Sequence, residues 1–243
     1  MEPNHMCSSS KTPRVDAEVL ENENLGSDIH RLIVSARDVA GASKPGHFAM
    51  LGLPGNTDLL LPRPFAVFDA DPKAGRVSVL LKVVGEGTRE LSVLKPGDRL
   101  SLLAPLGRGW KVRKTARALL VTGGTGYAAV HMLARELCAA GVDVCSIWGQ
   151  ANAECFPAGE GFDISGVESM MATDDGSAGF HGTSVDCVRD IMKEDSSDVA
   201  IYGAGPVPML KALAEFAIER NILCQVSLEA RMACGIGVCR GCV

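Results

Sequence analysis

The chain has 243 residues, of which 47% are hydrophobic and 22% charged, and its net charge at pH 7 is −5. A chain of this length predicts one or two domains with a sizeable core. The acidic balance and the lack of a basic cluster argue against binding to nucleic acid or to an anionic membrane surface. No run approaches the roughly 18 apolar residues of a membrane span.

Residues 1–14 are polar and lack the apolar stretch of a secretory signal, so we expect a disordered tail there. The chain holds nine cysteines. Six of them follow no regular spacing: Cys7, Cys138, Cys145, Cys155, Cys187 and Cys224. Scattered thiols of this kind favour a cytoplasmic protein over a disulfide scaffold.

Residues 15–112 have a strand-like pattern broken by Gly- and Pro-bearing turns. The expected strands cover 17–25, 30–37, 47–53, 63–71, 76–84 and 99–107. Short strands at this spacing predict a closed antiparallel barrel or a sandwich.

From residue 113 to 222, strands alternate with helices of 3.6-residue periodicity. The expected strands are 116–124, 143–149, 168–175 and 198–205, and the expected helices are 128–141, 183–194 and 206–221. This alternation predicts a parallel sheet with crossover helices.

Glycine-rich turns follow the first and the fourth of these strands. They contain Gly123, Gly124, Gly126, Gly205 and Pro206. Ligands of open α/β sheets bind at the carboxyl ends of strands, where glycine lets the backbone approach a pyrophosphate. The first turn lacks the full G-x-G-x-x-G fingerprint, and no acidic residue follows at the usual place, so a plain tight turn is the alternative.

Two motifs in the strand-rich half are candidates for binding a phosphorylated cofactor. Arg63, Pro64, Phe65 and Ala66 place a cation beside an extended backbone, which suits a phosphate and the edge of a flavin. The segment Lys82–Thr88, with Gly87, can cradle phosphate through N–H and hydroxyl donors. The alternatives are a surface arginine beside a proline turn and an ordinary hairpin.

Cys234, Cys239 and Cys242 have the spacing C-x4-C-x2-C in a glycine-rich setting. This spacing opens the plant-type binding run for a [2Fe–2S] cluster, whose fourth cysteine lies further on. The alternative is a set of zinc-binding or structural thiols. A fourth cysteine would lie beyond Val243, so we expect a truncated product; another fourth ligand or a missing cluster are the other possibilities.

The remaining polar residues suggest no further chemistry. His131 lies on the apolar pattern of an expected helix and is interpreted as a packing residue. Asp174 and Asp175 predict a turn, with a hydroxyl-binding carboxylate as the alternative. The histidines show no metal-ligand spacing, and no nucleophilic triad is evident.

Taken together, these motifs resemble those of the electron-transfer subunits of B-type (NAD-dependent) dihydroorotate dehydrogenases, in the ferredoxin–NADP reductase superfamily. The resemblance covers about residues 15–243. Its strongest segments are KPGHFAML, RPFAV, KVVGEGTREL, PLGRGW, ATDDGSAGFHG, GPVPMLKAL and SLEARMACGIGVCRGC.

The resemblance implies three parts. Residues 15–112 would be an FAD-binding β-barrel, 113–222 an NAD-binding α/β domain and 223–243 a [2Fe–2S] segment. The implied FAD-binding residues are Arg63, Pro64, Phe65, Ala66, Leu80, Leu81, Lys82, Gly87 and Thr88. The implied cluster ligands are Cys234, Cys239 and Cys242.

The implied function is an electron relay in pyrimidine (UMP) biosynthesis. A partner subunit oxidises dihydroorotate with its own FMN, and electrons pass through the cluster and FAD to NAD+. The expected assembly is a heterotetramer with two copies of each subunit. The cysteine loop is expected at the partner interface, and no side chain of this chain is expected to act as acid or base.

Several positions depart from the family pattern. Ala66 stands where relatives usually carry Ser or Thr near the flavin, and Ala204 replaces a cysteine that commonly precedes Gly-Pro. Thr122 and Thr125 lie in a turn that is usually richer in glycine and aliphatic residues. Two alternatives follow: a flavin/iron–sulfur reductase subunit of another NAD(P)H-dependent complex, or a redox-inactive binding module of the same fold.

Overall fold

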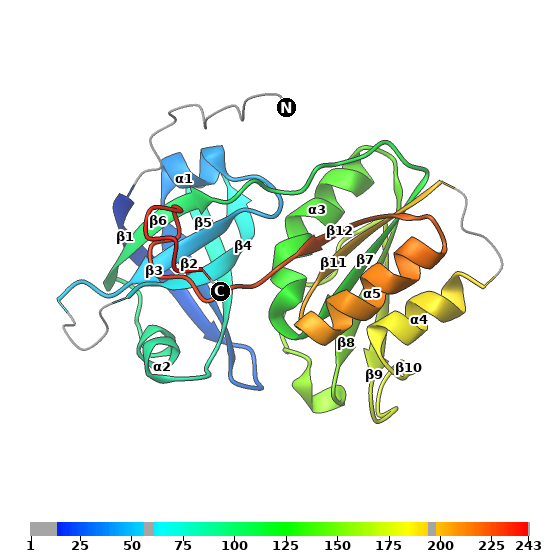
Figure 1. The fold of residues 1–243 in the computed structure, drawn as a ribbon. Helices are drawn as coiled ribbons and strands as arrows, with labels where there is room; N and C mark the ends of the chain where they lie inside the picture. Colours follow the sequence, from blue (N-terminus) through cyan, green and yellow to red (C-terminus); the bar gives the residue numbers. More distant parts are fainter. Residues whose placement is uncertain (1–13, 56–60, 194–197, 243) are drawn as a thin grey trace.

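Two halves follow each other along the chain, a β-barrel that ends at Leu106 and a helix-covered sheet that begins at Arg117 (Figure 1). The computed structural model describes residues 14–55, 61–193 and 198–242. None of the helices in these ranges has the length and apolar content that a membrane crossing requires.

The first half is a closed antiparallel barrel in which the strands follow the order β1-β2-β5-β4-β3-β6. The strands are β1 (Arg14–Asn24), β2 (Ile29–Ser35), β3 (Phe48–Gly52), β4 (Arg63–Asp71), β5 (Arg76–Lys82) and β6 (Arg99–Leu106). Alternate residues point inward, as β6 shows with buried Leu100, Leu102 and Ala104. The sequence-based prediction of a closed antiparallel barrel is therefore confirmed.

The barrel half also contains two short helices that the strand pattern does not predict, α1 (Arg37–Ala42) and α2 (Glu86–Ser92). The second begins where the sequence suggested a phosphate cradle or a hairpin. The Thr88 hydroxyl accepts hydrogen bonds from the Val84 and Gly85 N–H groups and donates to the Gly85 carbonyl. These bonds fix the first turn of α2 and the peptide that leads into it.

The second half is a six-stranded parallel sheet of order β10-β9-β8-β7-β11-β12. The strands are β7 (Arg117–Gly123), β8 (Asp143–Gln150), β9 (Val167–Thr173), β10 (Phe180–His181), β11 (Val199–Ala204) and β12 (Leu223–Ser227). The parallel sheet is thus confirmed. Its two short edge strands, β10 and β12, were not expected, and β12 lies within the segment that the resemblance assigned to the cluster.

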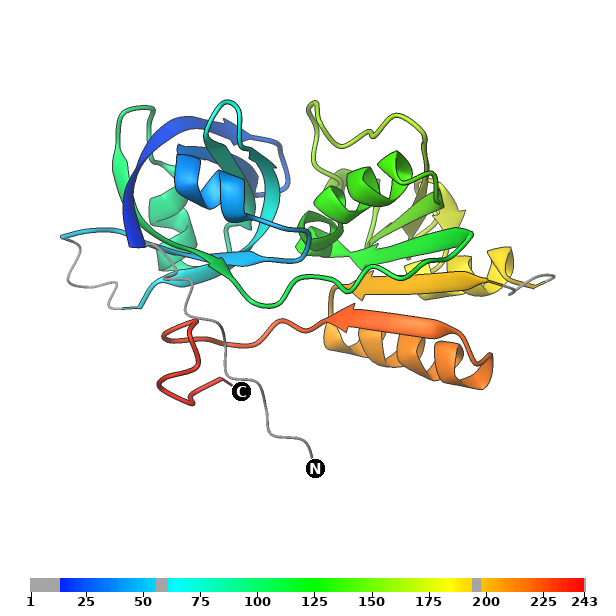
Figure 2. The ribbon, with the colours of Figure 1, turned by 90° about the horizontal axis from the view of Figure 1, so that it is seen from above.

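Helices cover both faces of the sheet (Figure 2). Buried side chains of α3 (Tyr127–Ala139) pack on one face, against Leu120 and Tyr202 among others. The helices α4 (Ser184–Ile191) and α5 (Val207–Glu219) pack on the other face, against Leu119 and Ile201. Successive sheet residues thus serve opposite cores, as expected of a sheet buried on both sides.

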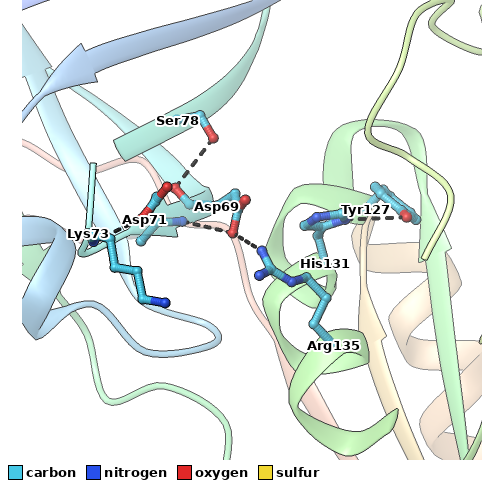
Figure 3. A network of polar contacts seen from close by, with 8 residues as sticks. Asp69, Asp71, Lys73, Ser78, Tyr127, His131 and Arg135 are labelled. Carbon is cyan, nitrogen blue, oxygen red and sulfur yellow. Dashed lines mark hydrogen bonds and ion pairs between the residues drawn. The ribbon is translucent and has the colours of Figure 1, made fainter. Parts of the chain in front are cut away.

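The two halves meet where β4 faces α3 (Figure 3). The ring of His131 stacks on Phe68 with 4.2 Å between centroids, and its Nδ1 lies 3.5 Å from the Tyr127 hydroxyl. The Arg135 guanidinium donates to the Asp69 carboxylate at 2.5 Å. His131 is buried, as expected of a packing residue, and burial lowers its pKa to about 4.

A loop of the second half adds a second contact between the halves. It contains the short 3-10 helix η2 (Ala153–Cys155) and runs to Phe162. Its Ala158 N–H donates to the Leu25 carbonyl at 2.6 Å, and its Glu160 carbonyl accepts from Arg31 at 2.6 Å. Phe162 joins the aromatic cluster of Phe68 and Tyr127. The two halves are therefore tied by packing and by hydrogen bonds.

After β12 the chain leaves the sheet and returns to the barrel, where it ends beside β3 and β6 (Figures 1 and 2). Gly235 allows the returning chain to pack closely against the barrel. A Cβ at this position would come within 2.6 Å of Met50 Cγ and 3.1 Å of Leu106 Cδ1. The cysteine loop, residues 234–242, is thus seated on the outside of the barrel.

Candidate functional site

A cavity of about 420 Å³ opens between the barrel and the parallel sheet; we call it the interdomain cavity. Its barrel wall is formed by Gly46, His47, Phe48, Arg63, Pro64, Phe65, Ala66, Leu80, Lys82, Val84 and Thr88. Its other wall is formed by Thr125, Ala128, Ala129, Ala204, Ser227, Leu228, Glu229, Ala230 and Met232. This size and this mixture of apolar and polar groups are typical of small-molecule sites.

The motif Arg63–Ala66 lies entirely on the wall of the interdomain cavity. The Arg63 side chain also lies against α2, since a Cβ at Gly87 would be 2.6 Å from its Nε and 2.7 Å from its Nη2. The guanidinium occupies the space that a side chain at Gly87 would need, and it donates to the Leu61 carbonyl. Arg63 and Thr88 lie in the same wall, and a cation there suits a phosphate group.

The three residues of β5 that were predicted to bind FAD, Leu80, Leu81 and Lys82, do not all face the interdomain cavity. Leu80 and Lys82 line the interdomain cavity, whereas Leu81 is fully buried in the barrel core. The reason is the two-residue period of a strand, which sends Leu81 to the opposite face. Gly87 borders the cavity through its contact with Arg63 rather than as a lining residue.

A second cavity, of about 610 Å³, lies at the carboxyl ends of the parallel strands; we call it the sheet-edge cavity. It is lined by Gly123, Gly124, Gly149, Gln150, Ala151, Asp174, Thr183, Ser184, Val185, Asp186, Arg189, Pro206, Pro208, Met209 and Ala212. Ligands of open α/β sheets bind at this edge. Gly123, Gly124 and Pro206 of the predicted set therefore lie in one cavity.

The two glycine-rich turns touch each other because β7 and β11 are neighbours in the sheet. A Cβ at Gly205 would lie 2.9 Å from the Gly123 nitrogen. A Cβ at Gly126 would lie 2.2 Å from the Ala204 carbonyl oxygen. Gly126 and Gly205 thus shape the turns by close backbone packing and do not line either cavity.

Sequence reasoning missed several residues of the sheet-edge cavity. The N-terminal turn of α4 belongs to it, and Thr183 and Asp186 form a capping box there. The pattern T-x-x-D is visible in the sequence and is the signal that locates this turn. Asp174, interpreted as a turn residue, lines the cavity, and its N–H donates to the Gln150 carbonyl at 3.1 Å.

In the cysteine loop, Cys234 is partly buried and Cys239 and Cys242 are exposed. The N–H groups of Cys239, Ile236 and Val238 and the Cys239 thiol lie close to the Cys234 sulfur and lower its pKa to about 6. A thiolate stabilised by backbone N–H groups is the form in which cysteine binds iron.

The sulfurs are not gathered around one point. Among the described residues, no three His, Cys, Asp or Glu side chains lie close enough together to hold a metal ion. The lowered pKa of Cys234 and the C-x4-C-x2-C spacing therefore fit an iron–sulfur cluster. The three sulfurs themselves are not close enough together to bind one in this arrangement.

The interdomain cavity contains the kinds of groups that FAD requires. It has the Arg63 cation beside Gly87, Thr88 in the first turn of α2, and a long apolar wall that includes Phe65 and Leu80. A dinucleotide needs these features for its phosphates and its ring system. The residues present fit this cofactor.

No protein-family model matches the chain. Among solved structures, its fold is similar to the NADH-dependent reduced ferredoxin–NADP oxidoreductase, with a TM-score of 0.83 and 27% identity over 92% of this chain and 79% of that one. The ferredoxin reductase of carbazole 1,9a-dioxygenase has the same fold, with a TM-score of 0.78 at 21% identity over 88% of this chain and 68% of that one. The fold is that of the ferredoxin–NADP reductases.

Curated relatives identify the family within this class. The chain is 36% identical to the electron transfer subunit of dihydroorotate dehydrogenase B (NAD(+)) from Caldanaerobacter subterraneus, over 94% of this chain and 87% of that protein. It is 37% identical to the same subunit of Listeria monocytogenes, over 95% and 89%. The chain belongs to the family of electron-transfer subunits of B-type dihydroorotate dehydrogenases.

Proposed function

We propose that this chain carries electrons from a dihydroorotate-oxidising, FMN-containing subunit to NAD+, using FAD and a [2Fe–2S] cluster of its own. The observation that carries the proposal is the course of the segment 227–232. Five of its residues line the interdomain cavity, and the segment continues directly into Cys234. The candidate flavin site and the candidate cluster ligands are thus adjacent along one short stretch of chain.

The residues of the interdomain cavity would bind and orient FAD. Arg63 and Thr88 would hold its phosphates, and the strand Arg63–Asp71 would lie along its ring system. At Ala66 no side-chain hydroxyl is available, so backbone groups would serve there. When bound, FAD and the cluster supply hydride and single-electron transfer, and the protein fixes their positions.

The residues of the sheet-edge cavity would bind NAD. Gly123 and Gly124 let the backbone approach a pyrophosphate at the start of α3, with Pro206 beside them. The Asp174 carboxylate lines the same cavity and would accept hydrogen bonds from ribose hydroxyls. NAD rather than NADP is proposed from the relatives, which are named as NAD(+) enzymes, because Arg189 lines the cavity together with Asp174 and would suit the extra phosphate of NADP.

The exposed cysteine loop would meet the partner subunit. Ile236 and Val238 are 53% and 77% exposed in this loop, next to the cysteines. Exposed apolar residues that lie together mark interaction surfaces. The relatives are named as subunits, which supports a catalytic partner. We extend this to an assembly with two copies of each subunit, in the pathway to UMP.

The proposal is tested by loading the purified chain with FAD and with iron and sulfide. Flavin and cluster absorbance, and bleaching of the flavin by NADH, are the expected results. A chain that stays colourless after FAD is added would overturn the proposal. A chain that binds FAD but is not bleached by NADH would instead favour a redox-inactive module, which Ala66 and Ala204 first suggested.

The structural similarity to the ferredoxin–NADP oxidoreductase favours one further candidate, a reductase subunit of another NAD(P)H-dependent complex. It would use the same cavities with a different partner. Electron transfer from dihydroorotate, measured after mixing the loaded chain with a catalytic dihydroorotate dehydrogenase subunit, separates the two candidates.

A further inference from the structure

One peptide of the glycine-rich turn after β7 lies between the two cavities. Gly124 lines the sheet-edge cavity, and the next residue, Thr125, lines the interdomain cavity. In the proposed function the nicotinamide of NAD must reach the flavin while the rest of the molecule stays at the sheet edge. The pyrophosphate that joins the two nucleotides of NAD would therefore pass over the Gly124–Thr125 peptide.

This peptide lacks the close contacts that fix its neighbours in the turn. A Cβ at Gly123 would lie 3.0 Å from Pro206 Cδ, and one at Gly126 would lie 2.2 Å from the Ala204 carbonyl oxygen. Gly124 has a φ of +58°, and nothing lies within 4 Å of a Cβ built on it. Because glycine has a wide conformational range, the orientation of this peptide depends on a contact from elsewhere.

Trp148 supplies this contact. Its indole N–H donates to the Gly124 carbonyl at 2.8 Å. In the part of the chain that the structure describes, this is the one side-chain hydrogen bond to residues 123–126, and neither η1 (Gly124–Gly126) nor α3 begins with a side-chain cap. Trp148 reaches the turn from the end of β8, while the next residue, Gly149, lines the sheet-edge cavity.

The indole is itself held in place by aromatic neighbours. It is buried and stacks on the Tyr127 ring, with 4.3 Å between centroids and an interplanar angle of 17°. The Phe156 ring meets it edge-on at 5.4 Å, and the Phe162 ring lies at 5.5 Å. A ring packed in this way keeps one orientation, so its N–H is directed at one place.

Building on the proposed function, we propose that Trp148 is a positioning residue for the pyrophosphate of NAD. In a trans peptide the carbonyl and the following N–H point in opposite directions. Because the indole holds the Gly124 carbonyl toward itself, the Thr125 N–H points away from the aromatic cluster. The first N–H groups of a helix have no partner within it and bind phosphate oxygens. Trp148 thus orients a phosphate donor without touching the ligand.

The proposal separates hydride donors that carry phosphate from those that do not. NADH carries the pyrophosphate, whereas 1-benzyl-1,4-dihydronicotinamide has the same reactive ring and no phosphate. Both reduce the same flavin. Trp148→Phe removes the indole N–H and keeps an aromatic ring beside Tyr127. A general disturbance of the fold or of the flavin site would slow both donors alike.

The experiment follows flavin reduction in the full FAD-loaded chain by anaerobic stopped flow. We expect Trp148→Phe to lower kcat/KM for NADH about tenfold, the effect of losing one hydrogen bond to a charged group. The limiting rate at saturating NADH and the rate with the benzyl donor should stay within about twofold, because only binding of the pyrophosphate is weakened.

Trp110→Phe is the matched control. Trp110 also donates its indole N–H to a carbonyl of α3, that of Ala129 at 2.7 Å, but this carbonyl lies outside the turn 123–126. Its loss is expected to leave the rates with both donors within about twofold of the wild type.

Binding of NAD+ gives a readout that needs no turnover. In calorimetric titrations of the FAD-loaded chain, the dissociation constant of NAD+ should rise about tenfold in Trp148→Phe and stay unchanged in Trp110→Phe. Should Trp148→Phe not fold, NMR of the wild type decides. The chain has two tryptophans and so two indole N–H resonances, which Trp110→Phe assigns. NAD+ must shift the resonance of Trp148, and 1-benzylnicotinamide must leave it in place.

Three results would each overturn the inference: equal affinity for NAD+ in Trp148→Phe and the wild type, equal slowing with both hydride donors, or a Trp148 resonance that NAD+ does not shift. In each case the wild-type chain still binds FAD and is reduced by NADH, so the proposed function stands. A FAD-loaded wild-type chain that NADH does not reduce would overturn the proposed function itself.

Discussion

The guanidinium of Arg63 lies directly over Gly87, so closely that a Cβ at Gly87 would come within 2.6 Å of its Nε. These residues are separated by the whole of β4 and β5, and the closure of the barrel brings them together. The guanidinium lies in the wall of the interdomain cavity, to which Thr88 also belongs. A side chain at position 87 would displace it.

Gly87→Ala is expected to displace the Arg63 side chain and to weaken FAD binding about tenfold, because a charge-assisted hydrogen bond to phosphate contributes about 1.5 kcal/mol. Fluorescence titration of the flavin-free chain measures the affinity. Gly85→Ala is the matched control, since nothing lies within 4 Å of a Cβ there. Equal affinities for the two variants would contradict the assignment of Arg63.

Gly126→Ala is expected to destabilise the second half by about 3 kcal/mol. A Cβ at Gly126 would lie 2.2 Å from the Ala204 carbonyl oxygen, and neither backbone can yield without disturbing β7 or β11. Urea unfolding measures this change. Gly41→Ala, where a Cβ meets nothing within 4 Å in α1, is expected to be neutral or slightly stabilising. An unchanged free energy of unfolding in Gly126→Ala would show that the two turns leave room for a Cβ at this position.

The pKa of His131 predicts an acid-sensitive contact between the halves. Burial, with Arg135 and Arg31 nearby, lowers this pKa from 6.5 to about 4, so the unfolded chain binds the proton more readily than the folded one. The contribution of neutral, buried His131 to the free energy of unfolding is therefore complete above about pH 6.5 and is lost as pH falls toward 4.

His131→Gln removes this titration. Between about pH 7.5 and 5 the free energy of unfolding of the wild type should fall by about 2 kcal/mol more than that of the variant. Denaturant titrations at the two pH values measure the difference. Parallel losses in both proteins would mean that His131 titrates normally in the folded chain.

Cys239→Ser is expected to abolish iron and sulfide binding while FAD binding is kept, because Cys239 lies in the cysteine loop, outside the interdomain cavity. Iron analysis and visible absorbance give the two readouts. Cys155→Ser is the control, because Cys155 lies in η2 and outside the C-x4-C-x2-C run. Retention of stoichiometric iron in Cys239→Ser would exclude this residue as a ligand.

Much of the fold could be predicted from local pattern. The barrel strands and the alternation of strands and helices follow from periodicity and turn residues, and both are confirmed. The short elements α1, α2, β10 and β12 were missed. The helices α1 and α2 have six and seven residues, less than two full turns, so an apolar pattern hardly repeats in them. A two-residue strand such as Phe180–His181 is defined by its partner β9 rather than by its own sequence.

Site residues that belong to one continuous motif could be predicted from the sequence. Residues whose place depends on how strands and segments pack against one another could not. Arg63–Ala66 and the turn at Gly123 lie in cavities as their sequences suggested. Leu81 was grouped with Leu80 although strand alternation turns it into the core. Glu229 was missed, because its place in the wall is set by the return of the chain from β12 to the barrel.

The most direct test of the proposed relay is NADH formation from dihydroorotate and NAD+, followed by absorbance, with a catalytic FMN-containing subunit present and this chain added or omitted. NADH is expected only when the chain, loaded with FAD and cluster, is added. A fully loaded chain that binds the catalytic subunit and still yields no NADH would contradict it.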